Sequence, residues 1–153
     1  MKFTILERML MLHLLPREHN IVMLREARKL REQLSISEKE NKKVDMRMCS
    51  DWVNGCPRCG STKTEIEKEN NIITPRRTCK DCGLKGAQGV NGDAMWHELP
   101  EPTDIKISNE MKNQIAGALK ALNKQNKIKE GHISIYEKFV EEIDQITDAT
   151  LIH

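Results

Sequence analysis

The chain has 153 residues, of which 38% are hydrophobic, 31% are charged and 3% are aromatic, and its formal net charge is +2. These values are ordinary for a globular protein of one domain or two small ones. No apolar run approaches the roughly 20 residues that a membrane-spanning helix needs, so we predict no membrane segment, and a net charge this small does not by itself indicate a partner.

Three helices are predicted in the first part of the chain. Apolar periodicity predicts one helix over residues 4–15, ended by Pro16, and a second over residues 21–34. Ser37 with Glu40 forms a capping-box pattern, so we expect a third, more polar helix to begin there. The apolar positions expected to face the core are Ile5, Leu6, Met9, Leu10, Leu12 and Leu14 in the first helix and Ile21, Leu24, Ala27, Leu30 and Leu34 in the second.

Two CxxCG segments, Cys56–Gly60 and Cys79–Gly83, are the most informative motif. In such a knuckle both sulfurs face one point, and backbone N–H groups of the turn can donate to them. Gly60 and Gly83 fit the exit of each turn, where a positive φ is cheap for glycine. The spacing predicts one structural Zn²⁺ ion with four thiolate ligands. These ligands are Cys56, Cys59, Cys79 and Cys82.

The residues between the two knuckles predict a β-hairpin. Residues 63–68 form one strand, Asn70 and Asn71 the turn and residues 72–78 the return, where Pro75 suggests an exposed edge. Both strands are mostly polar and bury little apolar surface. We therefore expect the metal to supply most of the folding free energy of this segment, roughly 10 kcal/mol or more.

Other interpretations of the cysteines have different requirements. Disulfides need an oxidising compartment, but Lys2, Glu7 and Arg8 interrupt the apolar start and argue against a signal peptide. A thioredoxin-like centre needs one CxxC at a helix start, and a rubredoxin-like iron site would need more aromatic residues around the metal. The fifth cysteine, Cys49, is interpreted as a free or partly buried thiol, because four ligands already complete the shell.

Two further helices are predicted after the zinc segment. The Leu-Pro-Glu-Pro segment at residues 99–102 is expected to be a stiff linker, and Ser108 is expected to cap the helix that follows. Gly131 interrupts the pattern, and residues 132–146 predict the last helix. The expected core positions are Ile107, Met111, Ile115, Leu119 and Leu122, then Ile133, Tyr136, Val140 and Ile143.

The apolar faces of the flanking helices are too small to form two independent domains. We therefore predict an α+β protein in which residues 1–48 and 103–153 pack together as one discontinuous helical domain. The zinc ribbon, at residues 50–98, is an insertion between its two halves.

No sequence signature of catalysis is found, so we predict that the protein is not an enzyme. Four cysteine ligands also leave no open position on the metal, as a catalytic zinc would require. Basic residues around the thiolates either offset the charge of about −2 at a four-thiolate zinc or contact nucleic acid or a partner. These residues are Arg58, Lys63, Arg76, Arg77, Lys80 and Lys85, of which Arg58, Arg76, Arg77 and Lys80 are the candidate contacts. Trp52 and Trp96 are expected to pack over the knuckles rather than to stack on bases.

The zinc segment resembles the restriction-alleviation protein Lar and its relatives, which are small zinc ribbons of phages and prophages. The resemblance covers about a third of the chain, and it differs at Arg58, Ala87 and His97 from residues usual in that family. It rests on Cys56–Ser61, Cys79–Gly83, Gly86, Ala94 and Trp96. It implies a zinc-ribbon fold and a phage origin.

The flanking segments are similar to a group of small uncharacterised bacteriophage proteins that join the two halves without a ribbon. That resemblance implies the same inserted architecture, and a location in the cytoplasm of a bacterial host. The segments that carry it are Thr4–Arg8, Leu14–Glu18, Leu30–Glu38 and Ser134–Val140.

From these features we expect a non-enzymatic phage accessory protein that acts by binding a host or phage protein. Anti-restriction, anti-defence and modulation of transcription are examples of such roles. Two alternatives are a nucleic-acid-binding module that uses Arg58, Arg76, Arg77 and Lys80, and a minor structural protein of the virion.

Overall fold

The structure, a computed structural model, contains two compact units. It describes residues 1–69, 72–142 and 144. One unit comprises Met1–Ser37 with Leu99–His153, and the other comprises Glu38–Glu98. Helices and strands are both present, in agreement with the predicted α+β class. No helix in the described part of the chain is both long and apolar enough to cross a membrane.

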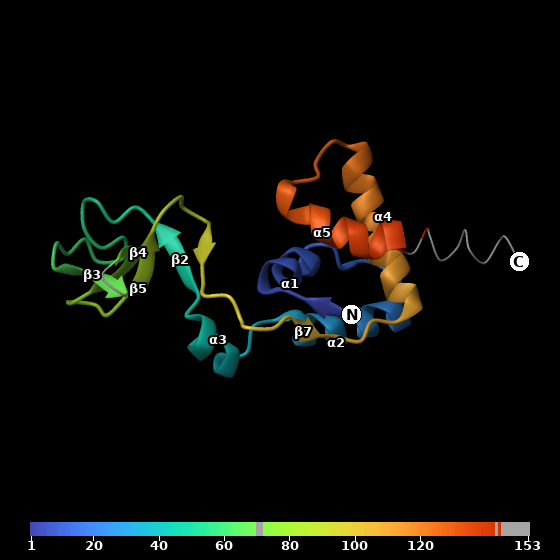
Figure 1. Cartoon of the computed structure of the whole chain (residues 1–153), viewed down its shortest axis with the longest axis horizontal. Coiled ribbons are helices and arrows are strands. Elements are labelled where there is room, and N and C mark those ends of the chain that lie inside the picture. Colours follow the sequence, from blue (N-terminus) through green and yellow to red (C-terminus); the bar gives the residue numbers. More distant parts are fainter. Residues whose placement is uncertain (70–71, 143, 145–153) are drawn as a thin grey trace, which may run out of the picture. The chain divides into compact units, whose positions relative to one another are not determined.

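The discontinuous unit consists of helices and one short ladder (Figure 1). Its strands are β1 (Lys2–Phe3) and β7 (Thr103–Asp104), which pair antiparallel although they come from the two separate chain segments of the unit. Its helices are α1 (Ile5–Leu12), α2 (Ile21–Leu34), α4 (Asn109–Lys124) and α5 (Ile133–Tyr136), with a 3₁₀ turn at Glu130–His132 and a π-helical segment at Glu137–Glu141.

Side-chain caps begin three of these helices. The Thr4 hydroxyl accepts a hydrogen bond from the Glu7 N–H at 3.2 Å, and the Glu7 carboxylate accepts one from the Thr4 N–H at 3.0 Å. Asn20 caps α2, and the prediction that Ser108 caps α4 is confirmed. Each cap satisfies a backbone donor that has no partner inside the helix.

Both chain segments of this unit contribute to one apolar core. Phe3 stacks on Phe139 with ring centroids 5.7 Å apart and planes 4° from parallel. Other buried apolar residues of this core include Met11, Leu30, Leu34, Ile115, Leu119 and Ile135. Residues from near the two ends of the chain therefore lie in the same core, as they must if neither segment has enough apolar surface alone.

Several expected core positions differ from those observed. In α1 the buried residues include Glu7 and Arg8, whereas Leu6 is exposed. In the last helical segment Phe139, which was not predicted, is buried together with the predicted Val140, whereas Ile133 is half exposed. Stacking of Phe139 on Phe3 buries this face of the helix, and that contact joins two residues far apart in the sequence. Ile143 lies outside the described residues.

The described residues of the unit Glu38–Glu98 form one helix and a sheet (Figure 1). The helix is α3 (Glu38–Val44), and the strands are β2 (Arg47–Ser50), β3 (Thr64–Glu69), β4 (Ile72–Cys79), β5 (Lys85–Gln88) and β6 (Ala94–Met95). Among the described residues the strand order is β3-β4-β5-β2-β6, and neighbours are antiparallel except for β2 and β5.

Residues 38–48, which the sequence placed with the helical domain, group with this second unit. Asp45 has a φ of 46°, which ends α3 and turns the chain into β2. Arg47 then pairs with Met95 of β6. Through this pairing residues 47–50 become a strand of the sheet. No local pattern in the sequence predicts the pairing.

The predicted hairpin is observed as β3 and β4, but β4 is not an edge strand. It pairs with β3 on one side and with β5 on the other. Pro75 has no backbone N–H to donate, but it lies outside both ladders. The ladder of β4 with β5 covers only residues 76–78, and the ladder with β3 shifts its register next to Pro75. The predicted turn at Asn70 and Asn71 lies outside the described residues.

Candidate metal centre

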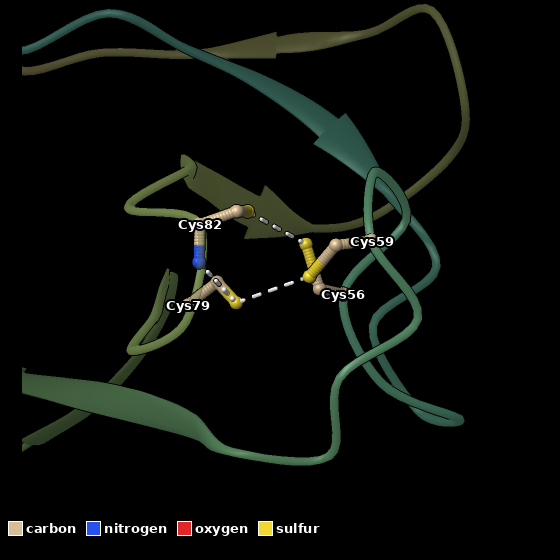
Figure 2. A group of neighbouring side chains, drawn as sticks. All are labelled: Cys56, Cys59, Cys79 and Cys82. Carbon is tan, nitrogen blue, oxygen red and sulfur yellow. Dashed lines mark hydrogen bonds between the residues drawn. The ribbon is translucent and has the colours of Figure 1, made fainter.

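Four cysteines from two separate turns converge beside the sheet (Figure 2). Cys56 and Cys59 lie in the loop before β3, Cys79 ends β4, and Cys82 lies in the turn before β5. All four sulfur atoms lie within 4.8 Å of one another, and this group could hold a metal ion. The Cys56–Cys82 and Cys59–Cys79 sulfur pairs are both 3.6 Å apart.

The two knuckles have the same backbone hydrogen bonds. In each, the first cysteine donates its N–H to the carbonyl five residues later and accepts at its own carbonyl from the glycine four residues later. The pairs are Cys56 to Ser61 at 2.8 Å, Cys79 to Leu84 at 2.9 Å, Gly60 to Cys56 at 2.8 Å and Gly83 to Cys79 at 3.0 Å. Gly60 and Gly83 both have φ of 75°, which confirms the prediction from the motif.

Backbone donors favour ionisation of the first thiol in each knuckle. Burial opposes ionisation of Cys56, but the N–H groups of Cys59 and Arg58 lower its pKa to about 7. The N–H of Cys82 likewise lowers the pKa of Cys79. At Cys59 the Ser61 N–H favours the thiolate, but burial and the neighbouring thiols raise its pKa to about 12. The protein dipoles therefore favour thiolates at Cys56 and Cys79, and a cation is needed to ionise the whole group.

Trp52 covers the cysteine group. It forms a buried cluster with Cys56 and Cys79, and Leu84 packs against that cluster. The indole lies so close to Gly86 that a Cβ atom there would be 2.8 Å from the ring. In contrast with the prediction, Trp96 is not part of this cluster within the described residues, and its indole N–H donates to Glu98 at 2.9 Å.

Arg76 is buried in a charge network, with only 3% of its surface exposed. This network lies on the face of the sheet opposite to the one that Trp52 covers. The Arg76 guanidinium donates to the Asp45 carboxylate at 2.8 Å and to the Asp45 carbonyl at 2.6 Å. Arg47 donates to the same carboxylate at 3.0 Å and to Glu67 at 2.9 Å. Arg76 is thus held in the interior of the unit and is not available for contact with nucleic acid or another protein.

The other three basic residues singled out from the sequence do not form one cluster with Arg76. Arg58 is exposed in the first knuckle, between its two cysteines. Lys80 is exposed but pairs with Glu65 at 2.8 Å. Arg77 is half-buried on β4, directly opposite Ile66 of β3 and Gly86 of β5. Neighbouring residues of a strand point to opposite faces, so Arg76 and Arg77 lie on different sides of the sheet.

Cys49 lies away from the four-cysteine group. It sits on β2 opposite Ala87, which also pairs with Arg76, so it is on the side of the sheet that carries the buried charge network. Burial and the nearby Asp93 raise the pKa of its thiol, so it is protonated at neutral pH. Its position fits the interpretation of a buried thiol that is not a ligand.

Comparison of the chain with models of protein families, with curated proteins and with solved structures found no match. The resemblance of the zinc segment to Lar stays a prediction, as does that of the flanks to bacteriophage proteins. The geometry of the four cysteines stands independently of either.

The sequence did not indicate the buried charge network of Asp45, Arg47, Glu67 and Arg76. Its members come from three different strands and a helix end, and their spacing follows no local motif. The one feature that marks part of it is the alternation in β2, where Arg47 and Cys49 are buried on one face and Met48 between them is exposed.

Proposed function

We propose that the four cysteines bind one Zn²⁺ ion as a structural site and that the unit Glu38–Glu98 is a zinc ribbon. In a tetrahedral site with Zn–S bonds of about 2.3 Å, adjacent sulfurs are about 3.8 Å apart. The two close sulfur pairs, at 3.6 Å, match this edge and are far too long for disulfides. Thiolate ligands in a tetrahedral arrangement favour zinc among the common cellular metals.

The proposed role is that of a non-enzymatic accessory protein that binds a host or phage protein. Four protein ligands leave no position on the metal for a substrate, which supports a structural role for the ion. Exposed apolar side chains lie in the same unit and suit a protein partner better than a phosphate backbone. They are Met48, Val53, Ile66 and Val90.

The placement of the basic residues weakens the alternative of nucleic-acid binding. Phosphate recognition needs several exposed cations that act together. Arg76 is neutralised in the interior and Lys80 is paired with Glu65, so the four residues do not form one basic surface.

A pull-down with the zinc-loaded full chain tests this function. We expect a bacterial protein to be captured by the wild type and by Cys49→Ser, but not by Cys79→Ser, which loses the metal. In parallel, binding to duplex DNA and RNA is measured across a series of salt concentrations. Tight binding at physiological salt, weakening by about 0.9 log units per phosphate contact for each log unit of salt, would replace the protein partner with a nucleic acid.

A further inference from the structure

A polar pocket of about 540 Å³ lies beside the candidate metal centre. This volume is in the range of pockets that hold small ligands or single side chains of a partner. Trp52 is buried and Gly55, Thr64 and Arg77 are partly buried, whereas Val53, Asn54 and Thr62 are exposed and lie at its mouth.

The sheet explains why Arg77 and Trp52 lie together. Directly opposite residues of an antiparallel pair point to the same face, so the Arg77 side chain lies on the face where a Gly86 Cβ would be. Trp52 occupies the space over Gly86 on that face. Because Gly86 has no side chain, the Trp52 indole can lie next to β4, the strand that carries Arg77.

Two buried donors of this pocket have no hydrogen-bond acceptor among the described residues. They are the indole N–H of Trp52, a residue with 2% of its surface exposed, and the Nε–H of Arg77. A buried donor without an acceptor destabilises the folded protein, so a ligand that supplies acceptors to both donors would remove that penalty.

The chemistry of the lining indicates an anionic ligand. Arg77 is the only charged residue among those that line the pocket in the described part of the chain, and the rest are Trp, Val, Gly, Asn and Thr. A guanidinium binds carboxylates and phosphates through paired N–H donors. A single cation with the apolar Val53 at the mouth and Ile66 opposite Arg77 suits one carboxylate on an apolar stem better than a chain of phosphates.

We propose that this pocket binds the C-terminal carboxylate of the partner protein, and that the last residue of the partner has an apolar side chain. This inference rests on the proposed function, because it takes the partner to be a protein. The first knuckle adjoins the pocket: the Gly55 N–H donates to the Trp52 carbonyl at 3.2 Å, and a Cβ at Gly55 would lie 2.7 Å from the Ser61 carbonyl oxygen. The wall of the pocket is therefore continuous with the first knuckle.

The test is a titration of the zinc-loaded, ¹⁵N-labelled full chain with N-acetyl-leucine, followed by NMR. We expect saturable shifts of the Trp52 indole N–H and Arg77 Nε–H signals, the two indoles being assigned with Trp96→Phe. N-acetyl-leucinamide, which lacks the charge, should produce no such shifts. Arg77→Gln should weaken binding at least about tenfold, and Arg58→Gln, an exposed arginine in the same unit, should leave it unchanged.

Native mass spectrometry of Arg77→Gln shows whether it keeps its zinc, and the wild-type titration tests the pocket without any substitution in its lining. Equal shifts with the acid and the amide, or no shift with either, would overturn the proposal. So would a thymidine oligonucleotide that shifts both signals at lower concentration than N-acetyl-leucine. A captured partner together with no response to N-acetyl-leucine rejects the pocket alone, whereas a response without any captured partner rejects the proposed function.

Discussion

Arg8 is fully buried in the helical unit, at the point where three segments meet. Its guanidinium donates to the Leu34 carbonyl at 3.1 Å, to the Ser35 carbonyl at 2.8 Å and to the Thr103 hydroxyl at 3.3 Å. The carbonyls at the end of α2 have no partner inside the helix, so this side chain caps them from α1. A charged residue in an apolar sequence pattern thus has a structural role.

Arg8→Lys should destabilise the helical unit by about 1–3 kcal/mol, because an ammonium group cannot reach all these acceptors and leaves buried carbonyls unsatisfied. Urea unfolding followed by helix circular dichroism measures the change. The matched control is Arg28→Lys at an exposed position of α2, which should change stability by less than about 0.5 kcal/mol. Equal stability of the two variants would show that the contacts of Arg8 contribute little.

Glu7 is the second buried charge of α1, and it pairs with Lys138 near the other end of the chain. The Lys138 ammonium lies 2.7 Å from the Glu7 carboxylate and donates to the Lys2 carbonyl at 2.8 Å. It also lies 5.2 Å from the centre of the Phe3 ring. Burial opposes ionisation of Glu7, but the hydrogen bond and charge of Lys138 and the Thr4 N–H hold its pKa below the ordinary value of 4.5.

Because the folded state lowers the pKa of Glu7, its contribution to stability is fully present above pH 4.5 and is lost as the pH falls through the lower, folded-state pKa. Glu7→Gln should therefore be less stable than the wild type at neutral pH, and the difference should shrink in acid. Urea unfolding across this pH range measures both effects. A difference in stability that stays constant with pH would mean that packing, and not charge, explains the effect of the substitution.

At the scale of elements, the sheet extends well beyond the hairpin that the sequence predicted. β5 reads Lys-Gly-Ala-Gln and β6 is only Ala94–Met95, so neither has the β-branched and aromatic residues that mark a strand. β5 forms because β4 lies on one side of it and β2 on the other. Its glycine is required for a separate reason, since Trp52 fills the space over Gly86.

Loss of the metal should unfold this sheet while the helical unit stays folded. We expect one zinc per chain by native mass spectrometry, absent in Cys79→Ser and retained in Cys49→Ser. The lost binding free energy, on the order of 10 kcal/mol, exceeds what a small polar sheet can supply by burial. A chelator should remove the strand signal in circular dichroism and leave most of the helix signal. Metal kept by Cys79→Ser, or lost by Cys49→Ser, would contradict the ligand assignment.

At the scale of the whole molecule, the segments that enter and leave the unit Glu38–Glu98 meet at one side chain. Ser35 precedes that unit and Thr103 follows it, and both accept hydrogen bonds from the guanidinium of Arg8. The Ser35 carbonyl oxygen and the Thr103 hydroxyl oxygen are therefore separated by no more than the width of one guanidinium group and its two hydrogen bonds. The helical unit can be closed at this point by a short connection.

A variant in which residues 38–98 are replaced by a Gly-Ser linker of about six residues should fold cooperatively as a helical protein. Its core side chains all come from the retained segments. Residues 1–48 alone should give neither a cooperative thermal transition nor a dispersed NMR spectrum, because they lack Phe139, Ile115 and the rest of the C-terminal half of the core. A cooperative transition for residues 1–48 would disprove the discontinuous domain.

The sequence by itself determined the features that depend on a few neighbouring residues. The positive φ of Gly60 and Gly83, the cap at Ser108 and the pairing of β3 with β4 were all predicted from local spacing and are observed. The tertiary structure alone decided which charges are buried and which short segments become strands. Arg8 and Arg76 acquire their roles from partners 20 or more residues away, and β5 becomes a strand by pairing with both β4 and the distant β2, so the energies come from those pairings rather than from local preference.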